Sequence, residues 1–275
     1  MAITAKQVNE LRQKTGAGMM DCKKALVEAD GDMEAAVDLL RKQGQKVAAK
    51  RGDREATEGL VIAKTTENGS KGVLICLNCE TDFVAKNEDF GKFANAIADL
   101  AVNNSVNTID ELKALSFEGI TLAEKIIEQT GVIGEKIDVS GLEVVEAAKV
   151  VAYNHPGNQI ASIVGFNQDL DLSETGKQVA MQVAAMNPIA VDKDTVAEDI
   201  IAREIEVGKE LAIQEGKPAE MAEKIAQGRL NKFFKENTLL NQAFVRDNKL
   251  SIQQFLQQTD KDLTVTDFKR ISLSI

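Results

Sequence analysis

An apolar strand pattern ends and a helical pattern begins within residues 78–86, NCETDFVAK. Before this stretch, residues 73–77 (VLICL) form a strand-length apolar run. After it, four apolar side chains follow at the spacing of one helix face: Phe90, Phe93, Ile97 and Leu100. Further upstream, Leu60 and Ile62 alternate as in a strand, and the Asn-Gly pair at 68–69 is a strong hairpin signal. The region therefore predicts a hairpin followed by a helix.

The same order of elements returns later in the chain. Residues 149–153 and 160–166 read as strands on either side of a turn at 154–158, NHPGN. A helical pattern follows from Leu172 to Met186 and ends before Pro188. Two hairpin-helix units in one chain predict an internal pseudo-repeat of architecture.

Helical segments precede and follow these units. The first 44 residues predict three short helices, with Asp32 as an N-cap and Gly44 as the final C-terminal cap. Residues 45–58 contain few bulky apolar residues and change from basic to acidic, which predicts a linker. Residues 195–236 carry two helical stripes on either side of a Glu-Gly-Lys-Pro turn, which predicts a helical hairpin.

The predicted fold is therefore α+β with more than one domain. A short helix at 251–257 and a final strand at 263–273 complete the second unit. The chain is predicted to divide into five parts. They are a three-helix domain at 1–44, a linker at 45–58, a first core subdomain at 59–140, a second core subdomain formed by 141–194 and 237–275, and a helical hairpin at 195–236.

The composition narrows the functional classes. The chain has 275 residues and a net charge of −10, which argues against a surface that binds nucleic acid or anionic membrane over its whole extent. Its longest apolar runs are far shorter than the roughly 20 residues that span a bilayer, so no membrane span is expected. Three cysteines and an N-terminus without a secretory signal pattern predict the reducing cytoplasm.

The chemistry-bearing residues are few. One histidine, one tyrosine and no tryptophan leave the usual acid-base, nucleophilic and zinc constellations without members. No glycine-rich phosphate loop is present either. We therefore expect no catalytic residues, no cofactor and no metal site, and we expect that the protein is not an enzyme.

Two motifs invite a catalytic reading. Cys76 and Cys79 form a CxxC pair, but both lie in a strand pattern, where residues three apart point to opposite faces, so ordinary strand residues are the favoured interpretation. His155 is the only histidine and lies in a turn, where a solvated side chain and a functional one are both open.

Two other motifs suggest contact with a partner. Met19 and Met20 open a helix, and either both form an adaptable contact surface or one packs in the core. Phe83 follows Asp82 at the strand-to-helix junction, either as an exposed wedge for a partner or as a buried staple. At the same junction Thr81 or Asp82 can cap the helix and Val84 can pack inward.

Several segments together resemble the bacterial elongation factor Ts family. They are residues 14–26 (KTGAGMMDCKKAL), residues 79–86 (CETDFVAK) and residues 215–229 (EGKPAEMAEKIAQGR), and the similarity extends from residue 3 to about residue 270. The resemblance implies an N-terminal ubiquitin-associated-like three-helix bundle, two related α+β core subdomains with antiparallel sheets, and an inserted antiparallel coiled-coil hairpin.

The resemblance also implies a function and a partner. The family acts as guanine nucleotide exchange factor for the GTPase elongation factor Tu and promotes GDP release by displacing magnesium. The resemblance implies that Thr81, Asp82, Phe83 and Val84 intrude on the GTPase, with Phe83 entering between helices. It further implies that Met19, Met20 and Lys23 contact the GTP-binding domain, and that the loop around His155 contributes to the core interface.

Two alternatives from other classes stay open at this stage. A binding adaptor would use the N-terminal bundle to capture another helix and would form a complex without accelerating nucleotide release. An enzyme that uses Cys76 or Cys79 would need a thiol of lowered pKa.

Overall fold

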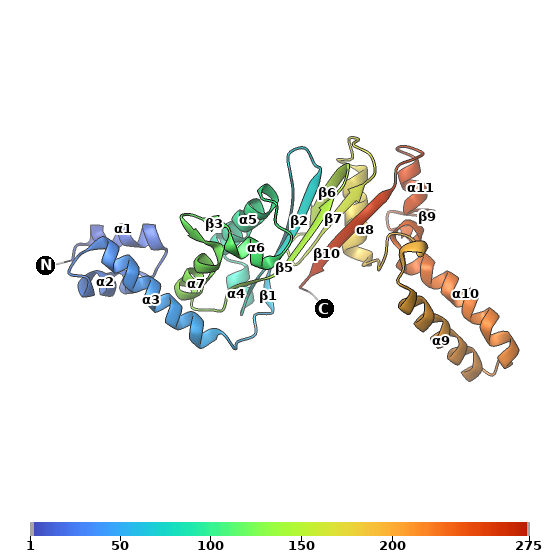
Figure 1. The fold of residues 1–275 in the computed structure, drawn as a ribbon, viewed down its shortest axis with the longest axis horizontal. Coiled ribbons are helices and arrows are strands. Elements are labelled where there is room, and N and C mark those ends of the chain that lie inside the picture. The colour runs from blue at the N-terminus through green and yellow to red at the C-terminus, as the bar shows by residue number, and fades with distance from the viewer. Residues whose placement is uncertain (1–2, 274–275) are drawn as a thin grey trace. The chain divides into compact units, whose positions relative to one another are not determined.

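The computed structural model describes residues 3–273 and has an α+β fold, which confirms the predicted class (Figure 1). The chain divides into two compact units. The first runs to Val61 and resumes from Ile75 to Leu142, and the second contains Ile62–Leu74 and continues from Glu143. Among the described residues, no helix combines the length and the apolar composition needed to cross a membrane.

Three helices form the N-terminal bundle: α1 (Ala5–Thr15), α2 (Met19–Glu28) and α3 (Met33–Arg51). Gly16 ends α1 in the left-handed conformation, and the Asp32 carboxylate caps α3 by accepting the N–H groups of Glu34 and Ala35 at 2.9 and 3.0 Å. The buried core of the bundle includes Leu11, Cys22 and Leu26. The three helices and the Asp32 cap are confirmed.

Helix α3 does not end at Gly44, so the predicted C-terminal cap is wrong. Gly44 lies inside the helix, where it faces Gly131 of α7 (Leu122–Ile133). A Cβ atom added to Gly131 would lie only 2.3 Å from the Gly44 Cα. The two glycines therefore allow close approach of two helices, and α3 continues to Arg51 through part of the segment predicted as a linker.

The middle of the chain alternates strands and helices: β1 (Glu58–Thr65), β2 (Lys71–Cys79), α4 (Asp82–Ala85), α5 (Glu88–Asn103), α6 (Ile109–Ala114), β3 (Ser116–Phe117), β4 (Ile120–Thr121), α7 (Leu122–Ile133) and β5 (Asp138–Glu146). The strands β1, β2 and β5 form a sheet in the order β1-β2-β5, and β3 pairs with β4. The β1–β2 turn is closed by the Thr66 N–H, which donates to the Lys71 carbonyl at 2.9 Å. Helix α5 buries Phe90, Phe93 and Ile97, as its apolar spacing predicts.

The second hairpin and its helix are also present: β6 (Lys149–Asn154), β7 (Ile160–Phe166) and α8 (Thr175–Met186). Strand β10 (Val265–Ser272) adds to this hairpin in an antiparallel sheet of order β10-β7-β6. The Ser162 hydroxyl on β7 donates to the Ala180 carbonyl of α8 at 2.7 Å, within a core that includes Phe166, Val179 and Val183. Helix and sheet thus share one hydrophobic core.

The two sheets have the same topology. In each, a hairpin is followed by a helix, and a later strand then pairs with the second strand of the hairpin. The predicted pseudo-repeat of architecture is therefore present. Each repeat also includes a third strand, which the sequence pattern indicated only for the second hairpin-helix repeat.

Helices α9 (Glu198–Gln214) and α10 (Ala219–Asn237) form the predicted helical hairpin (Figure 1). Small residues line the contact between them, and a Cβ atom on Gly208 would lie 3.1 Å from the Ala226 Cα. The Arg229 guanidinium donates to both oxygens of Glu215 at 2.7 and 2.8 Å near the turn. Close packing and an ion pair therefore hold the two helices together.

Short elements complete the second unit: two 3₁₀ turns (Lys193–Thr195 and Leu239–Asn241), β8 (Ala243–Phe244), β9 (Asp247–Ser251) and α11 (Ile252–Gln257). Phe244 and Phe255 stack with ring centroids 4.3 Å apart, which joins β8 to α11.

Candidate functional site

Strand β2 ends at Cys79 and the one-turn helix α4 begins at Asp82, as the change of pattern predicts. Thr81 occupies the N-cap position in extended conformation, but no side chain caps the helix there. The Thr81 hydroxyl instead donates to a Glu135 carboxylate oxygen at 2.7 Å. The expectation that Thr81 or Asp82 caps α4 is therefore wrong, because both side chains are engaged elsewhere.

Phe83 extends from α4 into solvent and is 83% exposed. This exposure excludes the buried-staple alternative. Asp82 forms an ion pair with Lys86 one turn later, at 2.6 Å. The hydrogen bond from Lys86 lowers the pKa of Asp82 and the same contact raises the pKa of Lys86, so both are charged at neutral pH. Val84 is half-buried, and Ala85 is the buried residue of the turn.

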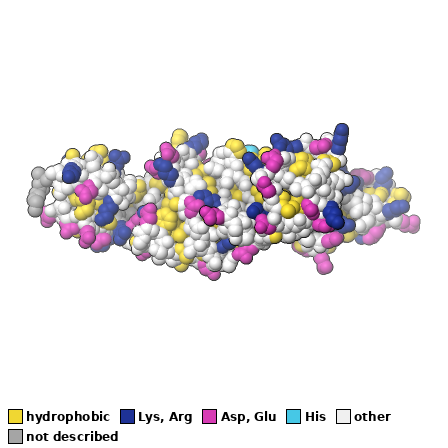
Figure 2. Space-filling model, turned by 90° about the horizontal axis from the view of Figure 1, so that it is seen from above, with side chains coloured by type: hydrophobic (Ala, Val, Ile, Leu, Met, Phe, Trp, Pro, Cys, Tyr) yellow, Lys and Arg dark blue, Asp and Glu magenta, His cyan; other side chains and the backbone are white. Residues whose placement is uncertain are grey.

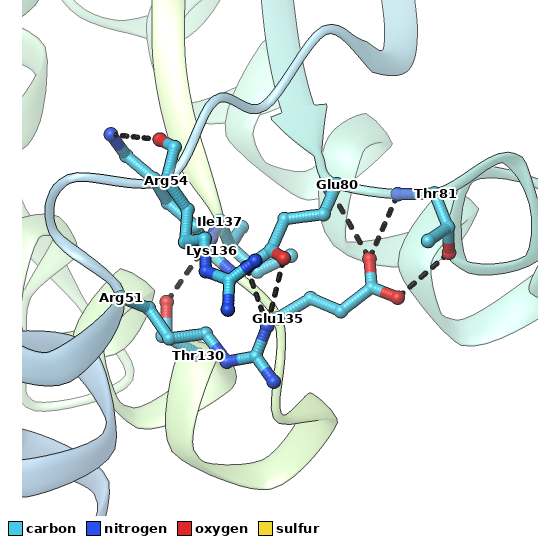
Figure 3. A network of polar contacts seen from close by, with 8 residues as sticks. All are labelled: Arg51, Arg54, Glu80, Thr81, Thr130, Glu135, Lys136 and Ile137. Carbon is cyan, nitrogen blue, oxygen red and sulfur yellow. Dashed lines mark hydrogen bonds and ion pairs between the residues drawn. The ribbon is translucent and has the colours of Figure 1, made fainter.

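Glu135 holds the backbone just before Phe83 (Figure 3). One of its carboxylate oxygens accepts the N–H groups of Glu80 and Thr81 at 3.1 and 3.0 Å, and the other accepts the Thr81 hydroxyl. Three donors thus converge on a single carboxylate.

Glu80 makes the reciprocal contact. Its carboxylate accepts the N–H of Lys136 at 2.7 Å and two hydrogen bonds from the Arg51 guanidinium at 2.7 and 2.8 Å. These contacts, first the backbone N–H and then the arginine, lower the pKa of Glu80. The Lys136 ammonium in turn donates to the carbonyls of Gly52 and Arg54 at 2.8 and 2.9 Å. We call this arrangement of Arg51, Glu80, Thr81, Glu135 and Lys136 the junction clasp.

The cysteine pair is not a reactive site. Cys76 and Cys79 are both buried, and burial raises the pKa of each thiol. The pKa of Cys79 reaches about 12, because the nearby Glu135 carboxylate adds to the effect of burial. The Cys79 thiol donates to the Thr81 carbonyl at 3.1 Å. A nucleophile needs a lowered pKa, so the thiol-enzyme alternative is wrong.

The two methionines of α2 are both exposed, Met19 at 54% and Met20 at 62%. The alternative that places one of them in the core is therefore wrong. Lys23 is exposed on the same helix. The sequence pattern did not single out Val27, which is 58% exposed and lies two turns after Met20 on the same side of α2. Its spacing from Met20 is the signal that could have indicated it.

His155 lies in the turn between β6 and β7 and is exposed. The Tyr153 hydroxyl lies 2.9 Å from its Nδ1 atom. The turn is anchored by Asn154, whose side chain accepts the Ala63 N–H at 2.7 Å and donates to the Ala63 carbonyl at 3.0 Å. The only histidine therefore has a defined orientation on an ordered turn.

Metal-binding side chains are not grouped in the part of the chain that the structure describes. Among residues 3–273, no three or more His, Cys, Asp or Glu side chains are grouped so that they could hold a metal ion. On the face shown in Figure 2, basic and acidic side chains are interspersed, without one large basic patch.

Comparison with known proteins identifies the family. The elongation factor TS family model matches residues 80–274. The chain belongs to the elongation factor Ts family. It is 51% identical over 272 residues to an elongation factor Ts of Christiangramia forsetii and 52% identical over 272 residues to one of Flavobacterium psychrophilum, with 98% of each chain covered in both cases. An elongation factor Ts of Cytophaga hutchinsonii is 50% identical over 275 residues, with 99% of each chain covered.

The family membership bears on the function of the chain as a whole. It supports a role as a translation elongation factor, and it confirms the resemblance that the three sequence segments indicated. The matched region begins at Glu80, directly before the exposed turn that carries Phe83.

Proposed function

We propose that this chain is a guanine nucleotide exchange factor for elongation factor Tu and promotes GDP release by displacing the magnesium ion of that GTPase. The observation that carries the proposal is Phe83, a large aromatic side chain that is 83% exposed on a turn whose backbone is fixed by hydrogen bonds. Exposed aromatic side chains on rigid supports supply much of the binding energy of protein interfaces.

The mechanism needs no covalent step. Magnesium in translational GTPases bridges the nucleotide phosphates to the protein, so a side chain that shifts its ligands weakens GDP binding. In this proposal Phe83 enters between helices of the partner, with Thr81, Asp82 and Val84 forming the rest of the intruding segment. Asp82 brings a negative charge, which its ion pair with Lys86 partly balances.

Exchange then follows from coupling between two ligands of the GTPase. The factor binds the nucleotide-free state best, and by reciprocity GTP binding weakens the hold of the factor. Couplings of about 1–3 kcal/mol would change affinity only about 5- to 150-fold. An efficient exchange factor must exceed this range, which favours contacts at several separate points.

Additional contacts are available on both units. Met19, Met20 and Lys23 form an exposed surface of α2, and we assign it to the GTP-binding domain of the partner. His155 supplies a further contact from the turn between β6 and β7. In this function the chain holds no catalytic residue, cofactor or metal of its own, and it works in the cytoplasm, where translation takes place.

The decisive experiment is release of a fluorescent GDP analogue from elongation factor Tu of the same organism, at fixed magnesium, with and without this protein. We expect a large acceleration that shrinks as magnesium rises. Acceleration that does not depend on magnesium would keep the exchange function and exclude the magnesium step. Tight binding without acceleration would exclude exchange and favour the adaptor.

A further inference from the structure

We propose that Glu135 is the positioning residue for the Thr81–Val84 segment, and that its carboxylate sets the orientation in which Phe83 meets the partner. This inference rests on the proposed function. It extends that function to a residue that lies outside the exposed segment and that no local sequence pattern indicates.

The backbone that carries Glu135 is itself held in place by contacts with the end of α7. Helix α7 ends at Ile133, and Gly134 follows in the left-handed conformation with φ of +80°. The Gly134 N–H donates to the Thr130 carbonyl at 2.9 Å, and the Thr130 hydroxyl accepts the Ile137 N–H at 3.2 Å. The loop is therefore closed onto the end of its own helix (Figure 3).

The segment needs such support because α4 is only four residues long. A single helical turn is not stable alone, since nucleation fixes several residues for one hydrogen bond. No side chain caps α4, and the exposed Phe83 ring contributes little burial that could hold the turn in place. Ala85 anchors the C-terminal end of the turn by burial.

Glu135 supplies the missing anchor at the N-terminal end. It accepts the N–H groups of Glu80 and Thr81 and the hydroxyl of Thr81, so three hydrogen bonds fix the two residues that precede α4. Hydrogen bonds to an ionised acceptor are stronger than those between neutral groups. The position of Phe83 is thereby defined by backbone contacts, and its side chain stays free for a partner.

Two substitutions separate the hydrogen bonds from the charge. Glu135→Ala removes all three acceptor contacts. Glu135→Gln keeps a carbonyl oxygen for the two backbone N–H groups and offers an amide that can donate to the Thr81 hydroxyl. Glu143→Ala is the matched control, because Glu143 is an exposed carboxylate of β5 outside the junction clasp.

The readout is the stimulated release of the fluorescent GDP analogue over a range of factor concentrations. We expect Glu135→Ala to lower the maximal release rate about tenfold, with a much smaller change in the concentration that gives half of that rate. Glu135→Gln should recover most of the loss, and Glu143→Ala should match the parent. In a Phe83→Ala background, Glu135→Ala should have little further effect, because Glu135 acts through Phe83.

Hydrogen exchange of the amides in residues 78–86 provides a second readout that does not depend on the partner. We expect the amides of Glu80 and Thr81 to exchange faster in Glu135→Ala than in the parent, while β2 keeps its protection. A general loss of structure would raise exchange throughout the chain and would argue against a local positioning role.

The outcomes separate this inference from the proposed function. If the parent accelerates release and Glu135→Ala does so equally well, the positioning role is excluded and exchange stands. If Glu135→Ala slows release by the same factor in the Phe83→Ala background, Glu135 does not act through Phe83 and the inference is wrong. If the parent itself does not accelerate release, the proposed function fails and this role fails with it.

Discussion

Glu80 and Glu135 are linked by two hydrogen bonds, each between a side chain of one segment and the backbone of the other. The Glu80 carboxylate accepts the N–H of Lys136, the residue after Glu135, at 2.7 Å. The Glu135 carboxylate accepts the N–H of Glu80 at 3.1 Å. Arg51, at the end of α3, donates two hydrogen bonds to the Glu80 carboxylate. The end of the N-terminal bundle is thus tied directly to the residue before Thr81.

Phe83→Ala should slow stimulated GDP release while leaving the fold intact. The side chain is 83% exposed, so its removal should change the free energy of unfolding by less than about 0.5 kcal/mol. Loss of an aromatic anchor at the centre of an interface costs about 2 kcal/mol or more in binding. The measurement is the stimulated release rate together with the melting temperature of the variant.

The matched control for Phe83→Ala is Val245→Ala. Val245 is also an exposed apolar residue, at 51%, but it lies outside the segments assigned to the partner. The Val245→Ala variant should stimulate GDP release at the same rate as the parent. A Phe83→Ala variant that is as active as this control would overturn the wedge role of Phe83.

Met19→Ala combined with Met20→Ala should weaken association with elongation factor Tu. Both side chains are exposed on α2, so the double variant should keep its melting temperature within a few degrees of the parent. We expect the dissociation constant, measured by direct titration, to rise about tenfold, which corresponds to about 1.4 kcal/mol. Unchanged affinity would remove α2 from the interface, and Ile213→Ala on α9 serves as the exposed apolar control.

The sequence predicted the strand and the junction from local periodicity. It singled out Phe83 as an unusual side chain, but it left open whether the ring is exposed or buried. It did not predict how the junction is held. Glu135 follows α7 in a loop, and nothing near it in sequence indicates that its carboxylate meets the end of β2. The one local signal is Gly134, which suits the end of a helix and would have drawn attention to the residue after it.

The end of α3 could not be predicted from the local sequence either, as Gly44 shows. Glycine after an apolar helical pattern is a reasonable stop signal, and the stretch after it has few apolar residues. The helix nevertheless continues, because Gly44 faces Gly131 of α7 at a close crossing of two helices. A contact between residues so distant in sequence leaves no trace in the local pattern.

Glu80→Gln should make the protein less stable at neutral pH and should reduce the change of its stability with pH in the acidic range. The pKa of Glu80 is lowered in the folded protein, from a reference value of 4.5, by the Lys136 N–H and Arg51. A lowered pKa stabilises the fold at pH above the unfolded-state value, and this contribution is lost as pH falls through the folded-state value. The difference in free energy of unfolding between parent and variant should therefore have its full value at pH 7 and should decrease as the pH falls below about 4.5.

The measurement for Glu80→Gln is urea unfolding between pH 7 and pH 3. At pH 7 the variant should lose about 1.5–3 kcal/mol, the range for hydrogen bonds to a charged group. Glu143→Gln, on the exposed side of β5, should show no such gap. A gap for Glu80→Gln that stays constant down to pH 3 would mean that the charge of Glu80 does not stabilise the junction clasp.

Gly131→Ala and Gly228→Ala should shift stability in opposite directions, although both place alanine in a helix. A Cβ atom at Gly131 would lie 2.3 Å from the Gly44 Cα, so α3 and α7 must move apart, at a cost of about 1–3 kcal/mol. A Cβ atom at Gly228 of α10 meets no described atom within 4 Å. There the higher helix propensity of alanine should add up to about 1 kcal/mol. Melting temperatures of the two variants and the parent test the pair: a Gly131→Ala protein that melts at or above the parent would show that the close crossing of α3 and α7 is not needed for stability.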